Sequence, residues 1–526
     1  MSLLLLAVLW AIGAPSAMAH ATMEESTPAA NSKLQQSPPV IELKFNEPVE
    51  SGVGSIEVLD SQSRKATSAK PELSSNGTVL KLKLPELEEG VYTVVYRILS
   101  EDGHPVSGSY VFVLGNPPEW KDADTFSNTF QAGSNSGQNN WLMYGLRIIY
   151  FAALLLATGV IAWSAWYRRP SAAVTSLFDR LALASTRVLL FAVLLLVFFQ
   201  AKEMMQGQSF SEWPALFIDT ATGRAWSLLI FFALLGFLVL KGNALLRSAW
   251  IIVILAIESL IGHPAANNPK LLTIALDFVH LLGSAVWVGG LVALLFIWYT
   301  KREEAGKFAA SFSQGAFLSL VALILSGIGM TLLFLPKLSY LWLTAWGGLL
   351  VVKTALVVLV LITGAWLRMR MKRSAIPDGK LLKVDAALMI SIVGIAAVFS
   401  YISPLPANAP YNFHEMGEDM HITLNVSPNV PGSDNTFKLQ VWMPEETGEP
   451  KAVILRLRSS DREDTPIDVP LEPFEDDSYS SFPGFIRTSY QAVGPFIPYA
   501  GKWKAELRIM NQEDEELLRE TSFQNY

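Results

Sequence analysis

The stretch Leu272–Tyr299 reads LTIALDFVHLLGSAVWVGGLVALLFIWY, and it indicates how the middle of the chain folds. An apolar run of ~20 residues is long enough to cross ~30 Å of hydrocarbon as a helix, and this run is longer. Asp277 and His280 bring a carboxylate and an imidazole into it. The stretch therefore predicts a transmembrane helix that carries polar groups at membrane depth.

Apolar runs of similar length recur on both sides of this stretch, and hydrophobic residues make up 51% of the chain. The runs predict eight transmembrane helices in the segment 141–402. Their expected ranges are 141–166, 181–201, 223–241, 245–262, 272–299, 312–335, 344–370 and 383–402.

The distribution of basic residues predicts the orientation of this bundle. Cytoplasmic loops carry an excess of Lys and Arg. With the mature N-terminus outside, the inner loops hold 14 Lys and Arg residues and the outer loops hold 3. We therefore expect both ends of the chain on the outer side of a bacterial cytoplasmic membrane.

Alternating apolar and polar residues predict β structure on both sides of the bundle. The first region, 20–115, contains several short strands separated by Gly, Pro and Asn turns, a pattern typical of a Greek-key β-sandwich. A polar linker is expected at 116–140. A second linker at 403–420 would precede another β-sandwich at 421–526. Residues 1–19 have the apolar run and the Ala17-Met18-Ala19 site of a cleaved signal peptide.

Composition excludes several classes of protein. The net charge is −7 over residues 20–140 and −11 over residues 403–526, so a nucleic acid partner is not expected. The chain has no Cys, which excludes disulfides and thiolate metal sites. It also lacks a Walker A phosphate loop, so no nucleotide partner is expected.

The first β region contains a candidate metal site. Cleavage after Ala19 would leave His20 at the N-terminus, where its α-amine and imidazole form a bidentate chelate. Asp102 and His104 would add a carboxylate and a second imidazole, and this nitrogen and oxygen set suits Cu(II). The alternative is that Asp102-Gly103 is a hairpin turn with His104 beside it.

The predicted bundle contains a second group of candidates at its outer end, namely Glu258, His263, Asp277 and His280. Ionisable residues at membrane depth are costly, so these side chains mark a candidate ion path. The alternative is a polar network that locks two helices together.

Two weaker clusters combine thioether groups with other ligand types. The cluster at the end of the second predicted helix is Glu203, Met204 and Met205, and the one after the last helix is His414, Met416, Met420 and His421. Packing in the first case, and a solvated acidic connector in the second, are the alternatives.

Several of these segments resemble copper-resistance families. His20-Ala21, Lys44–Val49, Gly90–Arg97 and Ser100–Gly108 resemble the CopC family over the whole first region. Gly262-His263-Pro264, Asp277–Gly290, Phe308–Phe312 and Thr344–Lys353 resemble the CopD family. The C-terminal region is similar to the YtkA-like modules through Asn425–Pro428, Phe437–Val441 and Gly501-Lys502-Trp503. The resemblance implies a Cu(II) site formed by His20, Asp102 and His104. Because only Met23 lies in the first domain, a methionine-rich Cu(I) site is not expected.

These observations predict a copper-uptake protein rather than an enzyme. The outer domain would capture Cu(II) and pass it into the bundle, where thioether ligands would favour Cu(I). The bilayer and copper are the expected partners, and an outer copper chaperone is a further candidate. One alternative is a copper buffering or resistance protein without transport. Another is a redox membrane protein, in which His20 and a second His act in a copper oxidase or His263 and His280 bind haem.

Overall fold

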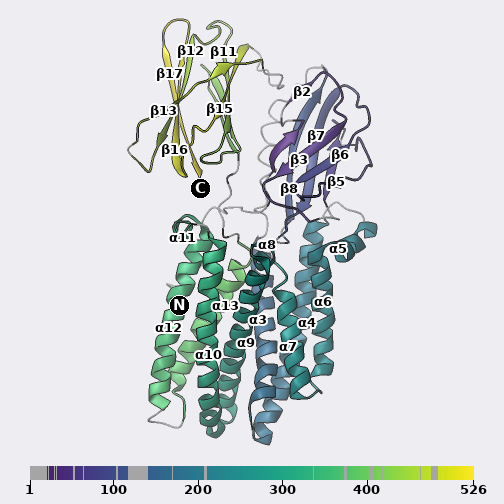
Figure 1. Cartoon of the computed structure of the whole chain (residues 1–526), viewed down its shortest axis with the longest axis vertical. Helices are drawn as coiled ribbons and strands as arrows, with labels where there is room; N and C mark the ends of the chain where they lie inside the picture. Colours follow the sequence, from purple (N-terminus) through teal and green to yellow (C-terminus); the bar gives the residue numbers. More distant parts are fainter. Residues whose placement is uncertain are drawn as a thin grey trace.

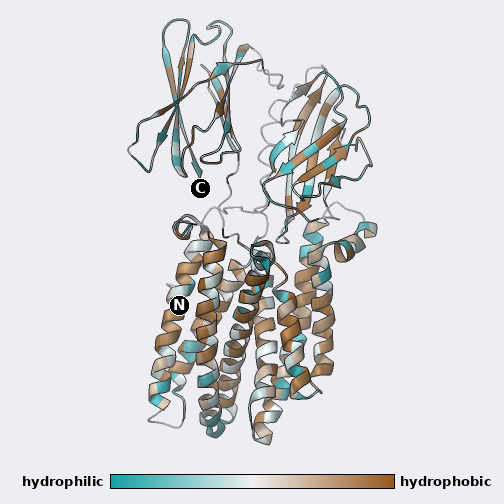
Figure 2. Cartoon of the chain, in the orientation of Figure 1, coloured by the Kyte–Doolittle hydropathy of each residue, from teal (hydrophilic) through white to brown (hydrophobic). Residues whose placement is uncertain are grey.

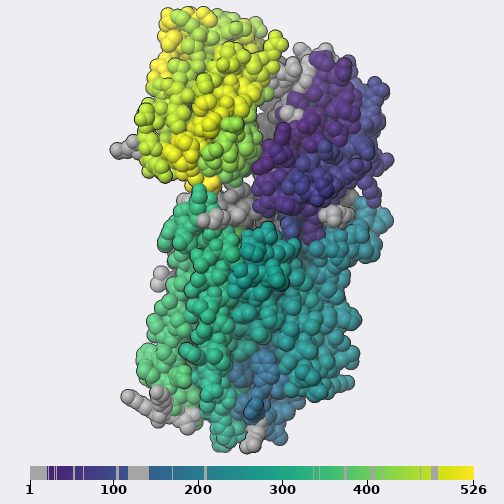
Figure 3. Space-filling model, viewed as in Figure 1, coloured from purple at the N-terminus to yellow at the C-terminus, as the bar shows by residue number. Residues whose placement is uncertain are grey.

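The computed structural model describes residues 21–526 apart from several short segments. The segments outside the description are 22, 29, 31, 51–53, 63, 102, 104, 116–139, 169, 206–209, 336, 372–375, 403, 405–407, 409, 418, 463 and 476–483. The described chain forms two β domains and one helical bundle, with both β domains at the same end of the bundle (Figure 1). The space-filling view shows the two β domains next to each other above the helices (Figure 3).

The N-terminal β domain consists of two four-stranded sheets, in the orders β1-β3-β6-β5 and β2-β8-β7-β4. Its strands are β1 (Met23–Thr27), β2 (Lys33–Leu34), β3 (Val40–Phe45), β4 (Ser55–Leu59), β5 (Glu72–Leu73), β6 (Val79–Lys83), β7 (Gly90–Leu99) and β8 (Pro105–Leu114). Alternate residues of β3 and β6, such as Ile41, Leu43 and Leu82, are buried in the core that the sheets share. The two-residue periodicity of these strands therefore produces the predicted sandwich.

The bundle is formed by long helices joined by short ones. They are α3 (Asn140–Trp166), α4 (Ala172–Met204), η1 (Phe210–Glu212), α5 (Trp213–Asp219), α6 (Ala221–Val239), α7 (Ala244–Glu258), α8 (His263–Ala266), α9 (Lys270–Thr300), α10 (Arg302–Phe334), α11 (Tyr340–Leu343), α12 (Ala345–Met371) and α13 (Gly379–Phe399). The hydropathy colouring shows that hydrophobic residues predominate along these helices (Figure 2). Large exposed side chains such as Phe191, Leu325 and Ile362 belong to this surface, which suits contact with lipid.

The prediction of eight membrane helices is matched only in part. Within the described residues, seven helices are long and apolar enough to span a membrane. The expected helix 245–262 ends early, because α7 stops at Glu258 and Gly262 adopts a φ of +76° before α8 begins. Conversely, α4 and α10 start about three turns before the expected residues 181 and 312. Their first turns are more polar than the apolar windows that predicted them.

Helices α3 and α9 form the centre of the bundle, and two glycines bring their backbones together. A Cβ atom on Gly159 would lie 1.9 Å from the carbonyl oxygen of Ala285, and one on Gly289 would lie 2.3 Å from the carbonyl carbon of Gly159. Small residues allow such close approach between membrane helices. This contact fixes α9 relative to α3 and therefore positions the polar side chains of both helices.

The C-terminal β domain also consists of two sheets over one core, in the orders β14-β15-β11-β10-β9 and β13-β12-β16-β17. Its strands are β9 (Tyr411–Met416), β10 (His421–Ser427), β11 (Asn435–Pro444), β12 (Ala452–Ser459), β13 (Ile467–Val469), β14 (Glu472–Pro473), β15 (Phe485–Gly494), β16 (Gly501–Met510) and β17 (Glu516–Asn525). The prediction of a linker over 403–420 is wrong in its second half. Tyr411–Met416 is the edge strand β9, and it pairs with β10 along its whole length.

Candidate functional site

The predicted Cu(II) ligands His20, Asp102 and His104 all lie outside the described residues. Ala21, the residue that follows His20, is buried in the core of the N-terminal domain. Strands β7 and β8 pair up to Leu99 and Pro105, and Ser100, Glu101 and Gly103 are the described residues between them. Gly103 has a φ of +80°, and its N–H donates to the carbonyl of Ser100 over 2.9 Å. The positive φ of Gly103 and this hydrogen bond place Gly103 in a turn.

A carboxylate lies buried inside the bundle at the end of α7. The hydroxyl of Tyr150, on α3, donates a hydrogen bond to the carboxylate of Glu258. Both side chains are buried. The electrostatic neighbours of Glu258 include Arg147 and Asp277. Glu258 therefore connects α3 to α7 and lies within electrostatic reach of the polar groups on α9.

Asp277 and His280 lie one turn apart on α9, on the same face of the helix. Asp277 interacts with the side chain of Ser259 and with Lys353, which comes from α12. The ammonium group of Lys353 also lies 5.5 Å from the ring centroid of Phe399. A cation–π contact of this kind adds to the attraction by Asp277. Lys353 is therefore a cationic group within electrostatic reach of Asp277.

The ring of His280 is oriented by α10. Its Nδ1 atom lies 3.0 Å from the hydroxyl oxygen of Ser326, and that hydroxyl donates to the carbonyl of Ala322 over 2.6 Å. The Ser326 oxygen can therefore accept a hydrogen bond from Nδ1–H, and in this tautomer the lone pair of the imidazole lies on Nε2. A hydrogen bond on one ring nitrogen that fixes the other as a ligand atom is typical of metal-binding histidines.

His263 lies at the start of α8 rather than at the end of a long helix. Its Nε2 atom is 3.1 Å from the carbonyl oxygen of Ile402, which follows α13, and its side chain is buried. Thr273 on α9 donates to the carbonyl of Pro264 over 2.6 Å. His263 is thus held next to the first turns of α9, at the end of the bundle that faces the β domains (Figure 1).

The thioether cluster at the end of α4 is part of the packing. Met205 is buried in the core of the bundle, and Met204 packs against that core. The side chain of Glu203 is exposed. This arrangement favours the packing alternative over a role in ligand transfer.

The second histidine cluster lies on one face of the C-terminal sheet. Strand pairing places His421 opposite Met416, and His414 opposite Thr423, whose hydroxyl lies 2.7 Å from Nδ1 of His414. Paired residues share a face, as do alternate residues of one strand, so His414, Met416 and His421 lie together. Met420 instead points into the core, where it is 1% exposed. Burial lowers the pKa of His421, and the nearby His414 lowers it further.

Two residues that interact with the predicted path were missed by sequence reasoning, Tyr150 and Lys353. Lys353 carries a usable signal, because it is an ionisable residue inside a long apolar helix. Tyr150 has no such signal, since its partner is 108 positions away in sequence. Within the part of the chain that the structure describes, no three His, Asp or Glu side chains converge on one point. The described His, Asp and Glu candidates therefore form separate partial sets of one or two such groups.

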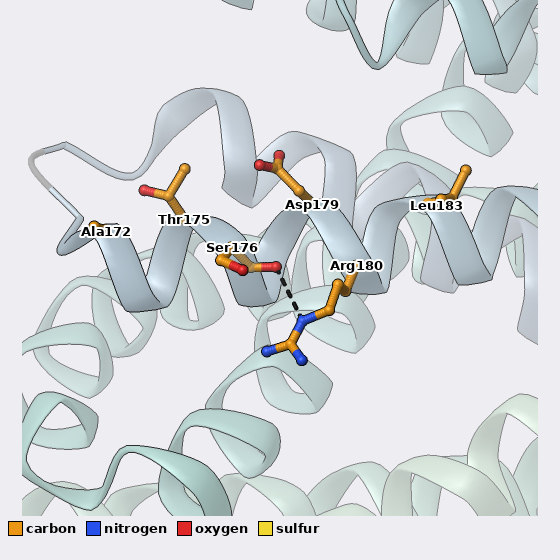
Figure 4. A pocket seen from close by; sticks show the side chains of 6 residues that line it. All are labelled: Ala172, Thr175, Ser176, Asp179, Arg180 and Leu183. Atoms are coloured by element: carbon orange, nitrogen blue, oxygen red, sulfur yellow. Dashed lines mark hydrogen bonds between the residues drawn. The ribbon is translucent and has the colours of Figure 1, made fainter.

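The structure also has a surface pocket on the first turns of α4, at the other end of this helix from α5. It is lined by Ala172, Thr175, Ser176, Asp179, Arg180 and Leu183, and Nε of Arg180 donates to the carbonyl of Ser176 over 3.3 Å (Figure 4). All of the lining residues belong to one helix, and none is among the candidate ligands.

Comparison with known proteins matches three segments of the chain. Residues 23–115 match the CopC domain, residues 138–270 match the N-terminal domain of copper resistance protein D-like proteins, and residues 306–400 match copper resistance protein D. The chain is 29% identical to the copper transport protein CutJ of Bacillus subtilis, over 83% of this chain and 84% of that protein. It is 32% identical to protein YobA of Escherichia coli K12, over 19% of this chain and 81% of YobA.

A crystal structure of CopC from Methylosinus trichosporium OB3b is 31% identical, covering 19% of this chain and 99% of that chain, with a TM-score of 0.18. The sandwich, the apolar helices and the matched segments together define a multi-pass membrane protein of the copper-resistance class. More narrowly, one polypeptide carries a segment that matches the CopC domain and two segments that match copper resistance protein D families. The predicted family is thereby confirmed, while the YtkA-like assignment of the C-terminal domain stays a prediction.

Proposed function

We propose that this protein captures Cu(II) on the outer side of the cytoplasmic membrane and passes it into the bundle for copper uptake. Capture is assigned to His20, Asp102 and His104, because their ligand types suit Cu(II). Transfer is assigned to His263, Asp277 and His280, with Glu258 beside them. The C-terminal domain has an accessory role on the same side, and His414, Met416 and His421 are candidates for a further copper site there.

The observation that carries the proposal is the oriented imidazole of His280 beside Asp277. His280 is the eleventh residue of α9, so it lies ~15 Å along the helix from Lys270. Charged groups at such depth are retained where they serve transport or relay. Membrane copper sites with few ligands would also release the ion readily to the next site, which conduction requires.

Lys353 gives the proposed path a simple way to accept a cation. In the metal-free protein its ammonium group is attracted to Asp277. An arriving copper ion would compete with Lys353 for this carboxylate, so the path needs no unpaired charge at membrane depth when it is empty.

Uptake of radioactive copper into cells expressing the protein tests the proposal. We expect His280→Ala to reduce uptake by about tenfold, because loss of a ligand or its orientation typically costs 10–100-fold in metal affinity or activity. Asp385→Asn is the matched control, since Asp385 is a buried carboxyl group on α13 outside the candidate set. Equal uptake by the wild type and His280→Ala would remove the transport assignment, and copper binding without uptake would favour buffering.

A further inference from the structure

The carboxylate of Glu50, in the N-terminal β domain, is bound at the first turn of α6 in the bundle. One oxygen of Glu50 accepts from the N–H of Ala221 over 2.8 Å. The other accepts from the N–H of Thr222 over 3.3 Å and from its hydroxyl over 2.6 Å. Helix N-termini expose unpaired N–H groups and favour negative charge. The Glu50 carboxylate therefore supplies hydrogen-bond acceptors and a negative charge to a helix that begins 171 positions later in sequence.

Only part of the α6 N-terminus is capped by its own neighbours. The side chain of Thr220 accepts from the N–H of Gly223 over 2.8 Å, which satisfies the third residue of the helix. The N–H groups of the first two residues, Ala221 and Thr222, are the ones that Glu50 binds. The contact thus completes a helix cap across two domains.

A second contact joins the same domains nearby. The carboxylate of Glu101 lies 3.1 Å from Nζ of Lys270, the first residue of α9. The next described residue, Gly103, approaches the bundle closely, because a Cβ atom there would lie 3.0 Å from the hydroxyl oxygen of Thr222. Glu50 and Gly103 thus meet at one residue, Thr222.

Backbone hydrogen bonds tie these groups of the β domain into one unit. The N–H of Glu50 donates to the carbonyl of Leu99 over 2.7 Å, and the N–H of Glu101 donates to the carbonyl of Pro48 over 3.3 Å. Val49 also forms a β-bridge with Ser100. Any movement of Glu50 away from α6 would therefore move Ser100 and Glu101 with it.

We propose that Glu50, together with the Glu101–Lys270 ion pair, docks the N-terminal domain on the N-terminal ends of α6 and α9. Docking holds the Glu101 end of the β7–β8 pair next to the first turn of α9 for copper transfer. Glu50, Thr222 and Lys270 are positioning residues rather than metal ligands. The inference rests on the proposed function for the transfer step, whereas docking itself does not depend on it. Helix α9 leads from Lys270 to Asp277 and His280, which makes its first turn a suitable receiving point.

Zero-length carbodiimide cross-linking in native membranes measures docking directly. It should join Glu101 to Lys270, and mass spectrometry would detect the joined peptides. Glu42 and Lys81, 2.7 Å apart within the N-terminal domain, provide an internal standard. We expect Glu50→Ala to lower the Glu101–Lys270 yield about fivefold relative to this standard, because the charge at the helix N-terminus is lost. An unchanged ratio would overturn the docking assignment.

Copper measurements on the same full-length variants separate positioning from metal binding. We expect Glu50→Ala to reduce copper uptake about fivefold while the Cu(II) affinity stays within about twofold of the wild type. Thr222→Val should have a smaller effect in the same direction, and Glu42→Ala should have none. The exchanged pair Glu101→Lys with Lys270→Glu should recover uptake that each single change loses.

The possible failures are distinguishable. If wild-type protein takes up no copper, the proposed function fails, and the cross-linking ratio alone decides whether the domains dock. If Glu50→Ala loses the cross-link but keeps full uptake, docking is real and its role in transfer is overturned. A loss of Cu(II) affinity equal to the loss of uptake would assign Glu50 to metal binding and overturn the positioning role.

Discussion

Lys353 is a cationic side chain within the apolar helix α12, and the nearby carboxylate of Asp277 offsets the cost of placing its charge there. Lys353→Met should destabilise the bundle by about 2 kcal/mol, because it leaves a carboxylate at membrane depth without its cation. Adding Asp277→Asn should recover part of this loss, since the second change removes the unpaired charge. Thermal unfolding in detergent, followed by tryptophan fluorescence, measures the coupling in a double-mutant cycle. Strictly additive effects would contradict the pairing.

The same residues show what the sequence can predict about a site and what it cannot. Asp277, His280 and Glu258 stand out because each interrupts an apolar run, and that signal needs no structure. A search for metal ligands passes over Lys353, because a protonated amine cannot bind a cation. The role of Ser326 in orienting His280 depends on how α10 packs against α9, and no local pattern in either helix encodes it.

At the scale of elements, the crossing of α3 and α9 holds the membrane candidates in register. Gly159→Ala should lower the unfolding temperature clearly and reduce the yield of folded protein, because the new methyl group would meet the carbonyl of Ala285. Backbone atoms cannot give way as a flexible side chain can, so the helices must separate. Gly364→Ala, on α12, is the matched control because a Cβ atom there meets nothing within 4 Å. Similar unfolding temperatures for both variants would refute the close contact.

The edge of the C-terminal sheet should give this domain a stability that depends on pH. The folded domain lowers the pKa of His421 below the ordinary value of 6.5, so the unfolded chain binds the proton more readily. Stability is therefore retained above about pH 6.5 and lost as the pH falls through that value toward the folded pKa. Thermal unfolding of the full chain between pH 7.5 and 5.5 should show this loss in the C-terminal transition.

His421→Gln is the informative variant for this effect, since its amide does not titrate. We expect a C-terminal transition whose midpoint changes less between the two pH values than that of the wild type. A pH response that is identical in both proteins would assign the effect to another group.

Element prediction succeeded where the periodicity of the residues was strong. Strands β3 and β6 lie in the region 20–115, where alternating residues predicted short strands, and the long apolar runs correspond to long apolar helices. The edge strand β9 was missed because His414, Met416 and their acidic neighbours look like a polar connector. Its strand structure depends on pairing with β10, so the pattern of β9 alone could not reveal it.

For the whole molecule, the number of membrane crossings decides on which side each domain lies. Both β domains lie at one end of the bundle (Figure 1), which requires an even number of crossings. Seven described helices meet the length expected for a span, so α7 must supply the eighth. Its 15 residues extend only ~22 Å. We infer that α7 crosses together with the turn at residues 259–262, and that the bilayer adapts locally to this short helix.

Single cysteines test this topology cleanly, because the natural chain contains none. We expect a membrane-impermeant maleimide to label Ser61→Cys and Glu513→Cys on intact cells, since these exposed positions lie in the two β domains. Lys307→Cys, near the start of α10, should be labelled only after the membrane is opened, because the basic residues at that end of the bundle favour the cytoplasm. Labelling of Glu513→Cys only in opened cells would leave seven crossings, and His414 and His421 would then lie on the opposite side of the membrane from the capture domain.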